Sequence, residues 1–225
     1  MKHKESDEKA RVGRIIELLE QATAGMPKPM SELIASEYNR DPYLILISCL
    51  LSLRSRDTQT YPICKELFKY IKTPQDAIDF PQDQLEAILR PIGFYKKKAV
   101  VVRQVSQVLI DIFDSKVPGT EEELLALPGV GRKTSSLVLG VAFGIPAICV
   151  DVHVHRVSNR LGIVSTHTVE DTEKALKACI PIDKWIEINH LLVMWGQNIC
   201  APVSPWCSKC VLAPLCPKIG VVRRR

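Results

Sequence analysis

The sequence is poor in aromatic residues and has no long apolar run, and both shortages narrow the class of protein. Phe, Trp and Tyr make up 6% of the 225 residues, which is low for an all-β sandwich. The longest uncharged run, residues 134–150, contains Gly140, Gly144 and Pro146, so it is too short and too interrupted to span a bilayer. No apolar stretch follows the charged N-terminal residues, so no secretory signal is expected. We therefore expect a soluble, intracellular protein without a membrane partner.

Acidic residues are missing from residues 201–225, which hold five basic residues. The charge of this segment, +5, therefore equals the net charge of the whole chain. This segment can meet an anionic partner or balance a buried anion. A second acid-free stretch, residues 90–103, also holds five basic residues, beside Phe94 and Tyr95. Basic residues next to an exposed aromatic ring suit a wedge that distorts a nucleic-acid duplex. The alternative is that these two rings pack in a core.

Apolar residues recur with helical spacing through most of the chain. Examples are Val12, Ile15, Ile16 and Leu19, and later Trp185, Ile188, Leu192 and Trp195. Pro and Gly separate these stretches at short intervals, which is typical of short helices joined by tight turns. The pattern predicts an all-α fold with about ten helices. Residues 148–154 are ambiguous, because their alternation from Val150 onward fits a strand equally well.

The segment Leu-Pro-Gly-Val-Gly-Arg-Lys-Thr, residues 127–134, predicts a hairpin between two helices. Thr120 and Glu123 form a capping motif for the first helix, and the second should begin near Gly131. The first amides of that helix lack intrahelical partners and suit a phosphate. Without a Cβ at Gly129 or Gly131, a nucleic-acid backbone can come close. The alternative is a tight turn that binds no ligand.

Two residues near this hairpin could carry chemistry. Lys133 lies in the first turn of the second helix, where the helix dipole disfavours a cation and so favours the neutral amine. A neutral lysine is a nucleophile that forms Schiff bases with sugar aldehydes. Asp151, between two valines, could stabilise a cationic sugar. The alternatives are a lysine that contacts phosphate, and a carboxylate that caps a helix or pairs with Arg156.

Four of the eight cysteines gather near the C-terminus with the spacing Cys-x6-Cys-x2-Cys-x5-Cys, and they are Cys200, Cys207, Cys210 and Cys216. Zinc sites usually combine two separated Cys-x2-Cys or Cys/His pairs, and only one such pair is present here. Cys216 is followed by proline, as in ferredoxin-type cluster motifs. The spacing favours an iron–sulfur cluster over zinc.

Taken together, these segments resemble endonuclease III, a family in the helix–hairpin–helix, Gly-Pro-Asp superfamily of base-excision DNA glycosylases. The resemblance rests on residues 127–134, on residues 150–162 and on the four cysteines, which occur in the same order. The eighteen-residue interval from Lys133 to Asp151 also matches. The similarity extends from about residue 40 to Pro217.

The resemblance implies a two-domain helix–hairpin–helix glycosylase fold with DNA bound between the domains. A six-helix barrel would span residues 35–145, with the hairpin motif at about 119–140. Residues 1–34 and 146–225 would form a discontinuous domain carrying a [4Fe–4S] cluster on Cys200, Cys207, Cys210 and Cys216. Asp151 would then precede a helix rather than lie in a strand. The protein would be a monomer, cytoplasmic or nucleoid-associated.

The resemblance also implies a bifunctional DNA glycosylase and apurinic/apyrimidinic (AP) lyase. The enzyme would flip an oxidised pyrimidine out of duplex DNA, form a Schiff base through Lys133 with help from Asp151, and cut the strand by β-elimination. Its partner would be double-stranded DNA with damaged bases or AP sites. A monofunctional mismatch glycosylase, whose branch lacks the lysine, and a non-catalytic helix–hairpin–helix DNA-binding module are the alternatives.

Further DNA contacts are implied at Arg54, Phe94, Gly129, Val130, Gly131, Arg132 and His153. The family usually has Gln at the position of Arg54, where the side chain fills the gap left by the flipped base. It usually has Leu at the position of Phe94, the wedge. Residues 201–206 lack the basic side chains that the family uses on phosphates, so Lys209 or the tail Arg223–Arg225 would have to substitute.

Overall fold

The computed structural model describes the backbone of residues 2–225 and the side chains from residue 7 onward. Every regular element in this range is helical, so the predicted all-α fold is confirmed. The described residues form twelve α-helices and two short 3₁₀ helices, compared with about ten helices expected. Residues 148–154 form no strand, and a helix begins at Val152. None of the helices within residues 2–225 has both the length and the apolar character needed to cross a lipid bilayer.

The helices group into two compact units. The hairpin unit comprises Pro29–Ile145, and the cysteine unit combines Met1–Lys28 with Pro146–Arg225. The first division therefore falls between Lys28 and Pro29, whereas residues 34 and 35 were expected to flank it. The reason is local, because Pro29 is the N-cap of a helix that belongs to the hairpin unit.

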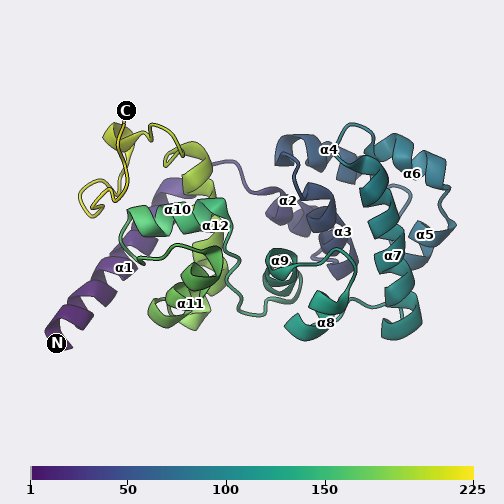
Figure 1. Cartoon of the computed structure of the whole chain (residues 1–225), viewed down its shortest axis with the longest axis horizontal. Helices are drawn as coiled ribbons and strands as arrows, with labels where there is room; N and C mark the ends of the chain where they lie inside the picture. Colours follow the sequence, from purple (N-terminus) through teal and green to yellow (C-terminus); the bar gives the residue numbers. More distant parts are fainter. Residues whose placement is uncertain (1) are drawn as a thin grey trace. The chain divides into compact units, whose positions relative to one another are not determined.

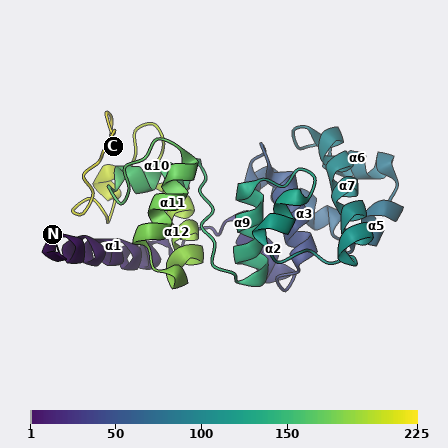
Figure 2. The same cartoon turned by 60° about the horizontal axis from the view of Figure 1, so that its bottom comes forward.

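The hairpin unit contains eight helices (Figure 1), which are α2 (Met30–Glu37), α3 (Pro42–Ser52), α4 (Asp57–Leu67), α5 (Pro74–Asp79), α6 (Gln82–Leu89), α7 (Tyr95–Phe113), α8 (Glu121–Ala126) and α9 (Arg132–Phe143). Helix α3 is its centre. Asp41 caps α3 by accepting a hydrogen bond from the Leu44 amide at 2.9 Å, and Pro42 occupies its first turn. Side chains from Tyr43 to Leu51 are all buried, because α3 packs against α2, α4, α7 and α9. Figure 2 shows α9 beside α2 and α3.

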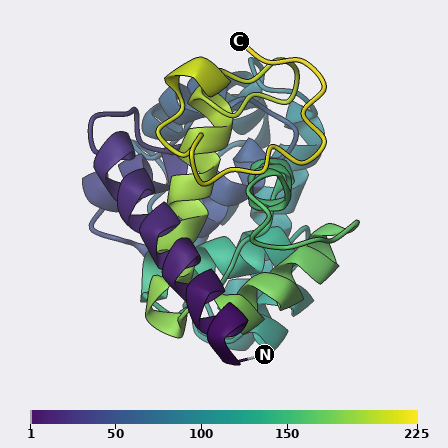
Figure 3. The same ribbon diagram turned by 90° about the vertical axis from the view of Figure 1, so that its left-hand side faces the viewer.

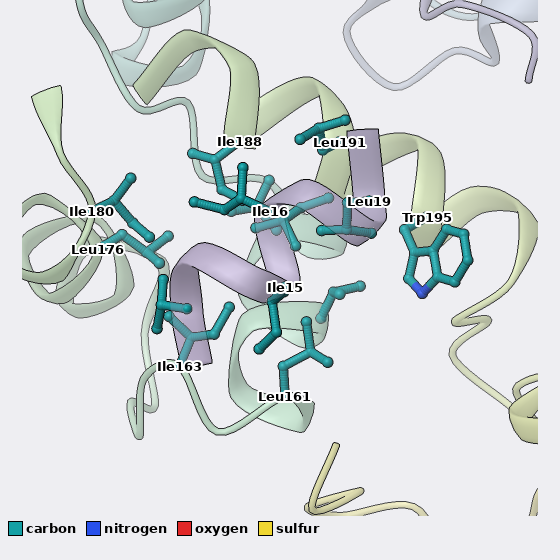
Figure 4. Close-up of a cluster of buried hydrophobic side chains, with 14 of the residues drawn as sticks. Ile15, Ile16, Leu19, Leu161, Ile163, Leu176, Ile180, Ile188, Leu191 and Trp195 are labelled. Atoms are coloured by element: carbon teal, nitrogen blue, oxygen red, sulfur yellow. The ribbon is translucent and has the colours of Figure 1, made fainter. Parts of the chain in front are cut away.

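The cysteine unit contains four α-helices and two 3₁₀ helices, which are α1 (Lys2–Thr23), α10 (Val152–Arg160), α11 (Val169–Cys179), η1 (Ile182–Lys184), α12 (Trp185–Asn198) and η2 (Cys207–Lys209). Helix α1 lies along α12 although the two are far apart in the sequence (Figure 3). The predicted apolar stripe of α1 provides the reason. Ile15, Ile16 and Leu19 point into a core that also contains Ile188 and Trp195 (Figure 4), and burial of such side chains stabilises the unit.

Candidate active site and cysteine cluster

The hairpin connects α8 to α9 through residues 127–131. Thr120 caps α8 by accepting a hydrogen bond from the Glu123 amide at 3.3 Å, as the capping motif predicts. Gly129 has a φ of +75°, a conformation that residues with a Cβ rarely adopt. A Cβ at this position would also lie 2.8 Å from Cγ1 of Val101 in α7. The turn itself therefore requires Gly129, whether or not a ligand binds.

Gly131 differs from Gly129 because nothing in the turn requires it. Its φ is −108°, and a Cβ built there would have no atom within 4 Å. Gly131 is the N-cap of α9, and no side chain caps this helix. Val130 has only 8% of its surface exposed, and its amide donates a hydrogen bond to the Leu127 carbonyl at 3.2 Å. The turn closes on itself, and the backbone at Gly131 is open to an approaching group.

Lys133 lies exposed in the first turn of α9, directly after exposed Arg132. The first turn of α9 contains no acidic residue, so two cations stand at the positive end of the helix dipole. Cys49 of the adjacent α3 is fully buried, and burial raises the pKa of its thiol to about 12, partly offset by Ser48 and by the charge of Lys133. Cys49 is therefore a neutral thiol at pH 7. Of these two potential nucleophiles, Lys133 is the accessible one.

Asp151 begins α10 in the cysteine unit. Its Oδ1 accepts hydrogen bonds from the amides of His153 at 2.8 Å and Val154 at 2.9 Å. It is therefore the N-cap of α10, which was the structural alternative considered for this residue. Both of these hydrogen bonds go to Oδ1, so Oδ2 takes no part in the cap.

His153 packs closely against α12. A Cβ on Gly196 would lie 2.9 Å from both Cβ and Nδ1 of His153, so the glycine permits this approach. Nδ1 of His153 accepts a hydrogen bond from Nη2 of Arg156 at 3.1 Å. Arg156 also donates to the carbonyl oxygens of Gly196, at 2.9 Å, and Cys200, at 3.1 Å. The structure thus gives His153 and Arg156 a shared position between α10, α12 and the start of the cysteine segment.

Arg54 and Phe94 lie side by side in the hairpin unit. Both adopt the left-handed conformation, with φ of 55° and 60°. The Cζ atom of Arg54 lies 5.7 Å from the centroid of the Phe94 ring, within the range of a cation–π contact. Phe94 is 56% exposed, so the alternative that it packs in a core does not apply.

The basic stretch at residues 90–103 is only partly available to an anion. Lys98 is 8% exposed, and its ammonium donates to the Leu51 carbonyl and to the Ser55 hydroxyl, both at 2.8 Å. Arg103 donates to the carbonyls of Ile78 and Phe80. Counting charge along the sequence therefore missed that two of the five basic residues serve the fold. The apolar neighbours Ala99 and Val102 were the available signal that this helix face turns inward.

The four clustered cysteines line one cavity in the cysteine unit. The same cavity is bounded by α10 and α12 through Val157, Arg160 and Trp195. Burial raises the pKa of the Cys210 and Cys216 thiols, so both are neutral unless a metal stabilises the thiolate. Four thiols facing one partly buried space form a donor set suited to iron or zinc.

The arrangement of these sulfurs bears on which group fits. A tetrahedral zinc with Zn–S bonds of ~2.3 Å requires sulfurs roughly 3.8 Å apart. A four-iron cluster binds each cysteine to a different iron, so it accepts sulfurs that lie farther apart. The four cysteines share one cavity, and such a donor set suits either group.

Hydrogen bonds from the helices fix the cysteine segment. Arg160 donates to Sγ of Cys200 at 3.6 Å, to the Ala201 carbonyl at 2.7 Å and to the Pro202 carbonyl at 2.7 Å. The Lys218 amide donates to Sγ of Cys216 at 3.3 Å. Donors of this kind orient metal-binding sulfurs and tune their charge.

Arginine from the N-terminal helix reaches the same segment. Arg11 of α1 donates to the carbonyls of Leu161 and Gly162, both at 2.9 Å, and to that of Leu215 at 3.2 Å. Leu215 immediately precedes Cys216. The first and last parts of the cysteine unit are thus joined directly beside a candidate ligand.

The basic residues near the C-terminus have local partners. Cζ of Arg225 lies 3.9 Å, and Nζ of Lys209 4.8 Å, from the centroid of the Trp206 ring. Arg225 also donates through its amide to the Pro205 carbonyl at 2.8 Å. Of the residues named as substitutes for the phosphate contacts, Lys209 and Arg225 therefore lie against Trp206 in the cysteine segment.

Comparison with known proteins identifies the class. A family model described as HhH-GPD superfamily base excision DNA repair protein matches residues 47–181. Endonuclease III of Thermotoga maritima is 45% identical over 176 residues, covering 78% of this chain and 83% of the relative. The chain belongs to the HhH-GPD superfamily of base excision DNA repair proteins and, within it, to the endonuclease III family.

Solved structures agree with this assignment. A non-covalent complex of endonuclease III with DNA superposes with a TM-score of 0.83 at 34% identity, covering 93% of this chain and 95% of that chain. A trapped covalent intermediate of endonuclease III with DNA gives a TM-score of 0.82 at 35% identity, covering 93% and 96%. The predicted helix–hairpin–helix glycosylase fold is confirmed.

Proposed function

We propose that this protein is a bifunctional DNA glycosylase and AP lyase that removes oxidised pyrimidines from duplex DNA. The observation that carries the proposal is the start of α9, where exposed Lys133 follows an uncapped, open backbone at Gly131. Amides at such a helix start suit a DNA phosphate. The phosphate contact would then bring a deoxyribose within reach of the lysine. Membership of a family of base excision repair proteins supports this interpretation.

The reaction divides between two residues. The lone pair of the Lys133 amine attacks C1′ of the sugar. The bond from C1′ to the base breaks, and the base leaves with the electron pair of the broken bond. The carboxylate of Asp151 offsets the positive charge that develops on the sugar. Lys133 and Asp151 belong to different units, so the proposal requires both to act on one nucleotide. A proton then passes from the nitrogen to O4′ as the C1′–O4′ bond breaks, which opens the sugar ring and leaves a protonated Schiff base between Lys133 and C1′.

The Schiff base then allows strand cleavage. Loss of a proton from C2′ is followed by rupture of the C3′–O bond, with the phosphate as leaving group. Water releases the amine at the end of the cycle. The proposed DNA contacts are the backbone of Gly129, Val130 and Gly131, together with Arg132, His153, Arg54 and Phe94. Phosphate contacts fix position without reading sequence, which suits an enzyme that must act at damage anywhere in DNA.

The test is a panel of duplexes that carry thymine glycol, a T·G mismatch, an AP site or no lesion, each paired with all four opposing bases. We expect base release from thymine glycol, accompanied by nicking, and nicking of the AP duplex. Base release from the mismatch without nicking would indicate a monofunctional mismatch glycosylase. Binding without any base release or nicking across the panel would indicate a DNA-binding module.

We further infer that Cys200, Cys207, Cys210 and Cys216 hold a [4Fe–4S] cluster. Bound there, the cluster would crosslink a segment whose only regular element is the three-residue η2. Arg160 and the Lys218 amide would donate to its sulfurs, and the cationic neighbours would offset its negative charge.

Iron analysis of protein purified without oxygen tests the cluster assignment. We expect about four irons per chain, and strong loss of iron in Cys210→Ser. Cys179→Ser is the matched control, because Cys179 lies at the end of α11 and does not line the cysteine cavity. Stoichiometric zinc, or equal iron in the wild type and Cys210→Ser, would contradict the assignment.

A further inference from the structure

We propose that Lys98 is a positioning residue, whose buried ammonium holds the Arg54 turn against Phe94 so that the two side chains enter DNA as one preformed wedge. The proposal rests on the glycosylase function proposed above. It concerns how the protein opens a base pair, which is a separate step from the chemistry at Lys133.

Lys98 connects the two turns at both of its ends. Its backbone amide donates to the Phe94 carbonyl at 3.0 Å in the first turn of α7. Its ammonium donates to the Leu51 carbonyl and to the Ser55 hydroxyl, each at 2.8 Å. Leu51 and Ser55 flank Arg54 on either side. One residue therefore links the turn that carries Phe94 to the turn that carries Arg54.

Both wedge residues occupy conformations that need such support. Arg54 and Phe94 have positive φ values, and this region disfavours residues with a Cβ. Strained residues persist where the surroundings over-determine them, and they gather at functional sites. The two turns also touch, since a Cβ on Gly93 would lie 3.9 Å from the Arg54 carbonyl.

The ammonium is costly as a purely structural element. Both of its hydrogen-bond acceptors are neutral, and burial lowers the pKa of Lys98. An apolar side chain of similar length would fill the space without this desolvation. The ammonium instead provides directional hydrogen bonds. It lies at the C-terminal end of α3, where carbonyl groups lack helical partners and attract a cation.

A preformed wedge lowers the cost of opening DNA. Apolar side chains inserted between base steps unstack them, and a guanidinium stacks on an aromatic face while its N–H groups remain free to donate. If the Arg54 turn moved freely, each insertion would also pay for ordering it. The hydrogen bonds of the Lys98 ammonium should therefore matter most when the damaged base is paired, and least when no base pair has to be opened.

The test compares kcat/KM on two duplexes with the same lesion, one with a pairing base opposite and one with an abasic spacer opposite. We expect Lys98→Met to lower the paired-to-unpaired ratio of kcat/KM about tenfold, equivalent to ~1.4 kcal/mol. Ser55→Ala removes one of the two hydrogen bonds and should lower the ratio by a smaller factor. Lys116→Met, which removes a 79% exposed ammonium from the same unit, is the control and should keep the wild-type ratio.

Fluorescence of 2-aminopurine placed beside the lesion gives a second readout, in which wild-type protein should unstack the probe more than Lys98→Met does. An unchanged ratio in both variants, or an equal loss on both duplexes, overturns the proposal while leaving the glycosylase function intact. If Lys98→Met does not fold, Ser55→Ala decides alone. A wild-type protein that acts on neither duplex overturns the proposed function, and this inference with it.

Discussion

Helices α9 and α10 each begin next to a candidate catalytic residue, and their first turns are built in opposite ways. At α10, Asp151 accepts hydrogen bonds from two amides and places a negative charge at the positive end of the helix dipole. At α9, Gly131 offers no side chain, and Arg132 and Lys133 place positive charges at that end. The charge at the start of α10 stabilises its helix, whereas the charges at the start of α9 do not.

The difference shows how function can be recognised at a helix terminus. A start that breaks the local rules without gain to the fold is expected at a functional site, and α9 meets this description. Asp151 teaches the complementary lesson, because a residue that stabilises its own helix can still supply a carboxylate to chemistry. The stabilising role alone would not have drawn attention to Asp151.

The largest expected loss of stability comes from a substitution in the turn that precedes α9. Gly129→Ala should lower the free energy of unfolding by roughly 2–4 kcal/mol, because the new Cβ is strained at positive φ and meets Val101. Urea denaturation measures this change. In a Val101→Ala background the same substitution should cost less, since the methyl group that it meets is gone.

Gly131→Ala is the matched comparison within the same turn. We expect a change in stability of less than about 0.5 kcal/mol, because the site is open and its φ is ordinary. DNA affinity should nevertheless fall, since the methyl group occupies the space that a phosphate backbone would enter. Unchanged DNA affinity in a stable Gly131→Ala protein would contradict the proposed phosphate contact at Gly131.

Stability and base release measured together separate the two roles of Asp151. Asp151→Ala removes the cap and should cost about 1 kcal/mol. Asp151→Asn keeps an oxygen that can accept from the His153 and Val154 amides, so its stability should stay close to that of the wild type. Base release should nevertheless fall ~100-fold or more in Asp151→Asn, because the charge is lost. Full activity in Asp151→Asn would reduce Asp151 to a structural residue.

Much of this architecture could be predicted from the sequence. Helical periodicity predicted the all-α fold, and the glycine spacing predicted the hairpin that joins α8 to α9. Periodicity left residues 148–154 open between a strand and a helix, because three alternating valines also fit a strand. The Asp151 cap shows that a helix begins here, as the resemblance implied. The sequence does not show that α2 packs on α3, and this contact places α2 in the hairpin unit.

The candidate sites were harder to read than the fold. Residue types and spacing located Lys133, Asp151 and the four cysteines, whose roles remain predictions. The neighbours Ala99 and Val102 signalled which face of the helix turns inward, but not what Lys98, the buried one of the three consecutive lysines, would contact. Its role depends on the long-range contacts with Leu51 and Ser55, and local patterns do not contain such contacts.

The most direct test of the central claim is borohydride reduction during turnover, followed by mass spectrometric mapping of the protein–DNA adduct. Reduction converts a Schiff base to a stable amine, so the account predicts an adduct on Lys133. It also predicts that Lys133→Gln forms no adduct while it retains DNA binding. An adduct on another amine, or an undiminished adduct in Lys133→Gln, would contradict the assignment of Lys133 as the nucleophile.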